Sequence, residues 1–166
     1  MKTIVVYESL WGNTAAVARA IAEGFGLDAQ VFSTAEATRD ILAGTDLIVA
    51  GSPLFAFQLP TDKIRENIRS KAATFPIPPN LSHPSLRNWL GTVPPGKGRS
   101  AAFETRLWWS PGGAVGTIQE ALQAVGYEPL TRGRRFRVVG IHGPLKGGEL
   151  NRAREWGALL ARKMER

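Results

Sequence analysis

Cysteine is absent from the 166-residue chain. Disulfide bonds, thiolate nucleophiles, and metal or iron–sulfur sites built on cysteine are therefore excluded. A protein without disulfides fits a reducing compartment, and we expect this one to be cytoplasmic.

Long apolar runs are also missing. The chain starts with Met1–Lys2–Thr3 and passes directly into an apolar run at residues 4–7, which is far too short for a signal peptide or a membrane span. No later run approaches the length needed to cross a bilayer. We therefore expect an intracellular protein with no membrane span.

Residues that serve as metal ligands or nucleophiles are scarce. The two histidines, His83 and His142, have no cluster of Asp or Glu around them, so we expect no metal site. No Gly-x-Ser-x-Gly nucleophile elbow occurs, and Ser52, which follows an apolar run, has no histidine obviously placed to serve it. The sequence therefore assigns no catalytic side chain.

Acidic residues are outnumbered: 14 Asp and Glu stand against 21 Lys and Arg, for a net charge of +7. Such a charge raises nucleic acid or an acidic surface as partners. The basic residues are spread over several stretches, partly mixed with acids, and no helix-turn-helix or zinc pattern occurs. We expect no specific nucleic-acid binding and interpret these residues as a solvated surface.

Short apolar strands alternate with amphipathic helices along the chain. We predict strands at residues 2–7, 29–32, 46–51, 100–105 and 135–141, and helices at 14–25, 33–43, 113–126 and 149–163, with a further helix capped by Thr61. Apolar strands between helices indicate a parallel sheet covered on both faces. The predicted fold class is α/β: one domain, residues 1–166, with a five-stranded parallel sheet in the doubly wound order 2-1-3-4-5.

The stretch from Phe75 to Arg99 breaks the alternation. It holds six of the eleven prolines, and a short helix at residues 84–90 would bury Leu86, Trp89 and Leu90. Because it carries these apolar anchors, we predict an ordered, irregular excursion within the domain and not a linker.

A small polar loop follows the first strand and opens directly into the first helix. Ser9, Asn13 and Thr14 offer side-chain donors, while Leu10, Trp11 and Gly12 add backbone N–H groups. Together with the positive end of the helix, these groups are suited to hold a phosphate without any lysine. The loop lacks Gly-Lys-Ser/Thr and the dinucleotide glycine spacing, which excludes a P-loop NTPase and argues against a Rossmann site.

The run Val6-Tyr7-Glu8-Ser9-Leu10-Trp11-Gly12-Asn13-Thr14 resembles the phosphate loop of the flavodoxin family, closest to variants with an aromatic residue before the glycine. The order of elements is similar over nearly the whole chain, with residues 75–99 the poorest match. The resemblance implies a flavodoxin-like three-layer sandwich that binds FMN and carries electrons. The alternative to the phosphate assignment is an ordinary strand-to-helix turn.

In flavodoxins the walls around the isoalloxazine ring come from the loops after strands 3 and 4. The corresponding loops here are unusually apolar. The resemblance therefore adds the following cofactor-binding residues to the phosphate loop: Pro53, Leu54, Phe55, Ala56, Phe57, Thr105, Arg106, Trp108 and Trp109. Arg106 would lie at the pyrimidine edge of the ring, or alternatively pair with Glu104 as a surface arginine. Some of the aromatic residues could instead pack inward or form a partner surface.

Three features depart from the flavodoxin pattern. The strand-3 loop has no glycine after Gly51, so we expect weaker stabilisation of the neutral semiquinone. The net charge is basic, whereas flavodoxins are usually acidic. Two tryptophans replace the usual glycine–aspartate pair in the strand-4 loop.

The function predicted from the sequence is electron transfer by bound FMN, with a redox partner protein or a small quinone-like acceptor. The alternatives are an NAD(P)H-dependent quinone or FMN reductase on the same fold, and an interaction module that has lost the flavin.

Overall fold

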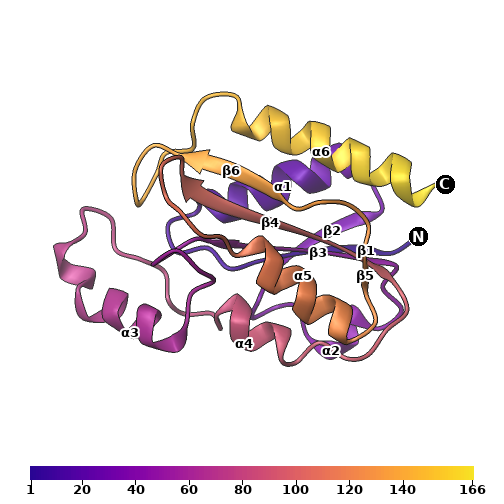
Figure 1. Ribbon diagram of the computed structural model, residues 1–166, viewed down its shortest axis with the longest axis horizontal. Coiled ribbons are helices and arrows are strands. Elements are labelled where there is room, and N and C mark those ends of the chain that lie inside the picture. Colours follow the sequence, from indigo (N-terminus) through magenta and orange to yellow (C-terminus); the bar gives the residue numbers. More distant parts are fainter.

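The computed structural model describes all residues, 1–166, and its centre is a twisted parallel sheet (Figure 1). Five strands are hydrogen-bonded in the order β2-β1-β3-β4-β5, and a sixth, β6, also pairs with β4. All of these pairings are parallel. The predicted fold class and strand order are confirmed. The strands are β1 Thr3–Tyr7, β2 Ala29–Ser33, β3 Leu47–Pro53, β4 Arg99–Leu107, β5 Glu128–Pro129 and β6 Arg134–Val138.

The fifth position of the sheet is split into two strands, which the sequence did not predict. β5 pairs with Arg99 and Ser100 at the start of β4, and β6 pairs with Phe103 to Leu107 at its end. The predicted strand at residues 135–141 ends early at Val138, because the chain turns back and Val138 bridges Leu145 in the antiparallel sense. A two-residue strand is too short to leave a periodic pattern.

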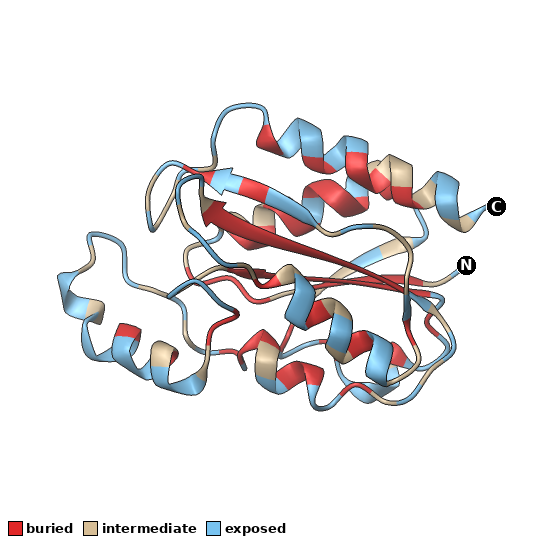
Figure 2. Ribbon diagram, in the orientation of Figure 1, coloured by how far each residue is buried: buried red, intermediate tan, exposed pale blue.

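Helices cover both faces of the sheet. Figure 1 shows α1 (Asn13–Phe25) and α6 (Glu149–Met164) on one face and α2 (Arg39–Leu42), α4 (Leu86–Leu90) and α5 (Val115–Ala124) on the other. The central strands are buried on both sides (Figure 2), as expected of apolar strands in a three-layer sandwich. No helix has the length and apolar character needed to cross a membrane.

The prediction of a helix at residues 33–43 is wrong for most of this range. Only Arg39–Leu42 is helical, and Thr38, in an extended conformation, caps it by accepting the N–H of Ile41. Before it, the Glu36 carboxylate accepts the N–H of Ser33 at 2.7 Å, which fixes a turn in place of a helix. The predicted cap at Thr61 is confirmed: its hydroxyl accepts the N–H of Ile64 and begins α3 (Asp62–Ser70).

The two helices on one face, α1 and α6, are in very close contact. A Cβ added to Gly157 of α6 would lie 2.0 Å from the carbonyl oxygen of Ile21 in α1. A Cβ added to Gly24 of α1 would lie 1.9 Å from the carbonyl oxygen of Arg154 in α6. Glycine at both positions lets the two backbones touch, and any side chain there would push the helices apart.

We expect Gly157→Ala to lower the free energy of unfolding by about 2–3 kcal/mol, because overpacking against backbone atoms cannot be relieved by a rotamer change. The matched control is Gly116→Ala in α5, where an added Cβ meets no atom within 4 Å. That change should raise stability by up to about 1 kcal/mol through helix propensity alone. Urea unfolding of both variants measures the two effects, and equal effects of the same sign would contradict the close-contact account.

Candidate functional site

The loop after β1 turns sharply into α1 at Gly12. Gly12 has φ +91°, a left-handed conformation that strains any residue with a Cβ, and it precedes the first residue of the helix. Within the turn, the Ser9 hydroxyl accepts the N–H of Gly12 at 3.1 Å. The backbone geometry of the turn therefore requires glycine at position 12, and the Ser9 hydroxyl stabilises the turn.

The start of α1 carries unpaired backbone donors. The N–H groups of Trp11, Asn13 and Thr14 make no hydrogen bond within the chain, and the first backbone bond of the helix joins Ala16 N–H to the carbonyl of Gly12. Such groups need an acceptor from water or a ligand. No lysine or arginine lies between Ser9 and Thr14, so the donors form a neutral anion cradle at the positive end of a 13-residue helix.

The hydroxyl of Thr14 lies at the base of this cradle and is buried. Its Oγ1 is 2.8 Å from Oγ1 of Thr105, at the end of β4, and either hydroxyl is able to donate. If Thr105 donates, the hydroxyl hydrogen of Thr14 is left free for an acceptor in the cavity. Two predicted cofactor residues from distant parts of the chain are thus in direct contact.

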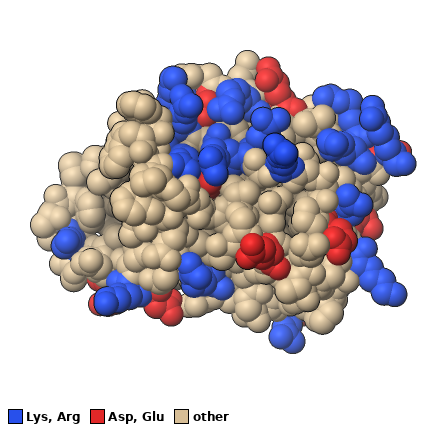
Figure 3. Space-filling model, viewed as in Figure 1, with Lys and Arg blue, Asp and Glu red and all other residues tan.

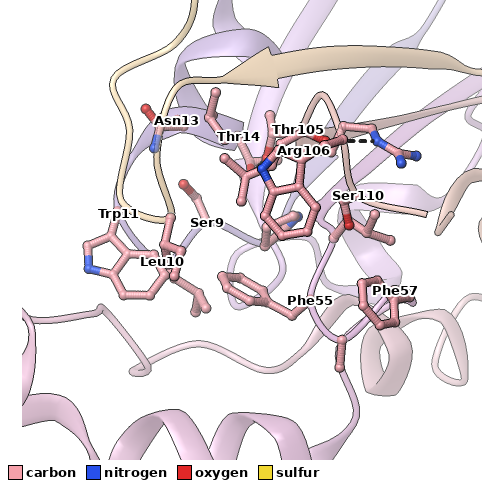
Figure 4. A pocket seen from close by; sticks show the side chains of 17 residues that line it. Ser9, Leu10, Trp11, Asn13, Thr14, Phe55, Phe57, Thr105, Arg106 and Ser110 are labelled. Atoms are coloured by element: carbon pink, nitrogen blue, oxygen red, sulfur yellow. Dashed lines mark hydrogen bonds between the residues drawn. The ribbon is translucent and has the colours of Figure 1, made fainter. Parts of the chain in front are cut away.

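A cavity of about 230 Å³ lies beside the cradle (Figure 4). It is bounded by the carboxyl ends of β1, β3, β4 and β6, the edge at which doubly wound sheets bind ligands. Of the predicted cofactor residues, all line this cavity except Gly12 and Trp108. Trp108 points away and is 73% exposed. The full lining is Ser9, Leu10, Trp11, Asn13, Thr14, Pro53, Leu54, Phe55, Ala56, Phe57, Thr105, Arg106, Leu107, Trp109, Ser110, Val138 and Ile141.

Val138 and Ile141 are wall residues that the sequence reasoning did not identify. Val138 is the last residue of β6 and Ile141 follows it closely. The signal that could have found them is their location at the carboxyl end of the last apolar strand, because the carboxyl ends of all parallel strands meet at one edge.

The loop after β3 forms one wall through a tight hairpin. Phe55 and Gln58 exchange two backbone hydrogen bonds, of 3.1 and 3.0 Å, across a two-residue turn. The turn residues Ala56 and Phe57 both have positive φ, 46° and 65°, the pattern of a type I′ turn that normally selects Asn and Gly. The carbonyl of Phe57 accepts the N–H of Gly113, which links this wall to the loop after β4.

Trp11 forms another wall and is surrounded by aromatic rings. Its ring centroid lies 5.8 Å from that of Phe55, 5.2 Å from that of Phe75 and 6.0 Å from that of His142. Contacts at these distances and tilted angles are favourable and hold the indole in place. His142, for which the sequence offered no role, is thus part of the aromatic surround of the cradle.

Arg106 lines the cavity and its side chain is buried. Its Nη1 donates to the carbonyl of Gly112 at 3.0 Å and lies 3.8 Å from the carboxylate of Glu104. The fully buried Glu104 also faces the Nε of Arg135 at 3.3 Å. Burial raises the pKa of Glu104, although both arginines oppose that shift.

The proline-rich stretch at residues 75–99 packs against the loop at residues 9–14. The carbonyl of Ile77 accepts the indole N–H of Trp11 at 2.8 Å, and Asn80 N–H donates to the carbonyl of Leu10 at 2.7 Å. His83 Nε2 accepts the N–H of Ser9 at 3.3 Å. These three contacts brace successive loop residues from behind, a role that the sequence did not predict.

A buried ion pair supports this brace. Glu8, directly before the loop, contacts Nη1 of Arg65 in α3 at 2.5 Å and accepts the N–H of Leu86 at 2.9 Å. Arg65 also donates to the carbonyl of His83. Burial raises the pKa of Glu8 despite these partners. The pair ties β1 to α3 and to the proline-rich stretch, and removing one partner would leave an uncompensated buried charge.

Solved structures that match the chain include flavodoxins and the core of a flavodiiron protein. A flavodoxin from the domain Archaea matches over 100% of both chains with a TM-score of 0.68 and 25% identity. Flavodoxin 1 from Bacillus cereus matches over 98% of each chain with a TM-score of 0.68 and 18% identity. The Flv1 flavodiiron core from Synechocystis matches 99% of this chain over 36% of its own, with a TM-score of 0.66 and 19% identity.

No protein-family model and no curated protein matches the sequence. The three structures nevertheless agree in covering essentially the whole chain. The chain therefore has the flavodoxin-like fold.

The ring of His83 gives the brace a pH dependence. Burial, with a smaller effect from the nearby Arg65 charge, lowers the pKa of His83 from 6.5 to about 4. The folded protein therefore disfavours the protonated ring, and stability from His83 is lost as the pH falls from about 6.5 to about 4. Protonation also removes the lone pair that accepts the Ser9 N–H.

We expect the free energy of unfolding of the wild type to fall, relative to His83→Gln, by on the order of 2 kcal/mol between pH 7 and pH 4.5. Glutamine retains an acceptor but does not titrate, and the difference between the two profiles removes contributions from Glu8 and other groups. Urea unfolding at a series of pH values gives both profiles. Parallel profiles would show that His83 does not carry this dependence.

Proposed function

We propose that the chain binds FMN in the cavity at the carboxyl edge of the sheet and serves in electron transfer. The observation that carries the proposal is the neutral cradle of unpaired N–H groups at Trp11, Asn13 and Thr14, which opens into a cavity with apolar walls. A phosphate monoester needs the first feature and a flavin ring needs the second. Both lie at the topological switch point of a doubly wound sheet.

The residues present fit FMN. Ser9, Asn13 and Thr14, with the backbone of the loop, would hold the phosphate (Figure 4). The aromatic side chains of Trp11, Phe55 and Trp109 line the cavity and would supply ring-stacking surfaces. Arg106 would lie near the polar edge of the ring. FMN supplies one- and two-electron redox chemistry when bound, so no catalytic side chain is needed.

The structural neighbours support the redox assignment. They include an oxidised flavodoxin from Bacillus cereus and a two-electron reduced flavodoxin from Megasphaera elsdenii, the latter at 20% identity and a TM-score of 0.60. An electron-transfer role requires a redox partner, which would be a protein or a small quinone-like acceptor. The main alternative is an NAD(P)H-dependent quinone or FMN reductase.

We expect Thr14→Val to weaken FMN binding by about one to two orders of magnitude, because it removes one hydrogen bond to a phosphate dianion. Asn13→Ala should weaken it to a similar extent. The matched control is Thr3→Val: Thr3 is also buried and its hydroxyl has no hydrogen-bond partner, but it lies at the opposite end of β1. Titration of the apoprotein followed by flavin fluorescence measures each dissociation constant.

Three outcomes decide between the alternatives. Unchanged FMN affinity in both Thr14→Val and Asn13→Ala would refute the phosphate assignment. A purified protein that takes up no flavin would favour the interaction module. Steady consumption of NADPH with a quinone, without any added reductase, would favour the enzyme.

The turn at Ala56 and Phe57 provides a separate test of the cavity wall. Ala56→Gly should raise the free energy of unfolding by about 0.5–1 kcal/mol, because glycine relieves the left-handed strain at φ 46°. The control, Ala43→Gly at φ −58°, should lower it by a similar amount. Thermal unfolding compares the two, and destabilisation by both changes would contradict the strained turn.

A further inference from the structure

A second, larger hollow adjoins the proposed FMN site, which we call the flavin cavity, and seven of its thirteen lining residues are cations. This arginine groove, of about 1010 Å³, runs along the open edge of β6 to the start of α6. Figure 3 shows Lys and Arg side chains gathered over this part of the surface. Its basic lining residues are Arg106, Arg132, Arg134, Arg135, Arg137, Lys146 and Arg152.

Most of the charge in the arginine groove is not neutralised within the chain. Arg106 and Arg135 share Glu104, and Arg152 contacts Glu149 at 2.7 Å. The other four cations, Arg132, Arg134, Arg137 and Lys146, form no ion pair. Seven cations around two carboxylates leave a strong positive potential, which attracts an anionic partner across several ångströms of solvent. Some positive charge on an edge strand also prevents strand-to-strand aggregation, but that need does not produce a concave surface.

Exposed apolar side chains lie beside these cations. Trp108 lines the arginine groove and is 73% exposed, and its neighbour Trp109 lines the flavin cavity and is 59% exposed. Val139, which lines a further hollow with Trp108 and Arg137, is exposed as well, as is Ile141 in the wall of the flavin cavity. Large exposed apolar residues rimmed by charge are characteristic of protein interfaces, in which Trp and Arg carry much of the binding energy.

The residues that line the arginine groove argue against a site for a small molecule. Small-molecule sites are mostly apolar with a few polar groups, whereas the arginine groove has only Trp108 and Val115 as hydrophobic lining residues. The basic surface also continues beyond it, through Arg134 and Arg152 to Arg162 on α6. A long strip of cations with tryptophans at one end fits a large acidic surface better than a compact ligand.

We propose that the arginine groove and Trp108 form the docking surface for an acidic redox protein. This inference rests on the proposed electron-transfer function and specifies its partner by charge. Arg106 lines both the flavin cavity and the arginine groove, so a protein docked on Trp108 lies next to the bound cofactor. The proposed partner is acidic, whereas the partners that acidic flavodoxins attract are basic.

Binding of an acidic plant-type [2Fe–2S] ferredoxin, used as the probe, tests the proposal by calorimetry. We expect the dissociation constant to rise about tenfold or more when the ionic strength is raised from about 20 mM to about 200 mM. The double variant Arg132→Glu/Lys146→Glu should weaken binding by a further factor of about ten or more at low salt. Both residues are exposed and lie in loops, so the sheet is left intact.

A matched control separates a local surface from overall charge. Lys63→Glu/Lys71→Glu makes the same change in net charge on and after α3, and should weaken binding no more than about twofold. Trp108→Ala should weaken binding about tenfold, whereas Ile77→Ala, which removes another exposed apolar side chain, should have little effect.

The outcomes that overturn the proposal are distinct. Equal losses in the two charge-reversal variants would mean that only net charge matters, and absence of ferredoxin binding at low salt would remove the proposed partner class. Tighter binding of a short DNA duplex, or of NADPH, with the same dependence on Arg132 and Lys146 would assign the surface to that ligand instead. FMN uptake, measured separately on the same samples, tests the proposed function: ferredoxin binding to a protein that takes up no FMN would preserve the surface and refute the function.

Discussion

Backbone N–H groups hold an anion well only when the loop that carries them is already fixed before the anion arrives, because ordering a loop costs about 1–2 kcal/mol per residue. In this chain no cation in the loop offsets that cost. The loop is fixed from behind by hydrogen bonds to Ile77, Asn80 and His83, and the buried pair of Glu8 and Arg65 fixes that brace in turn. The cradle at the start of α1 thus depends on a charge pair that makes no contact with the cavity.

The parts of the fold that the sequence predicted are those set by local pattern. Apolar runs such as Leu47–Ala50 predict buried parallel strands, and the alternation of these strands with helices predicts the strand order of the sheet. The prediction of a helix at residues 33–43 failed because the Glu36 carboxylate accepts the N–H of Ser33 and fixes a turn there, so that the helix begins only after its cap at Thr38. β5 was missed because its two residues are fixed by pairing with β4 and not by their own sequence.

The parts of the candidate site that lie within one segment of the sequence could be predicted. The contacts that join distant segments could not. The loop at residues 9–14 and the two apolar loops after β3 and β4 could be found because each follows a recognisable strand. The contact of Thr14 with Thr105 joins residues 91 positions apart, and the contact of His83 with Ser9 joins residues 74 positions apart. The spacing of residues along the sequence does not predict contacts of this kind. Trp108 and Trp109 illustrate the limit, since adjacent residues of one type face different hollows.

Arg106 belongs to the lining of both the cavity at the carboxyl edge of the sheet and the arginine groove. Its guanidinium takes one position at a time, and that position is held by Gly112 and Glu104. A ligand in the cavity and a protein on the groove would therefore both meet this one guanidinium. If the proposed cofactor changes the affinity for the proposed partner through Arg106, thermodynamic linkage requires that the partner changes the affinity for the cofactor by the same factor.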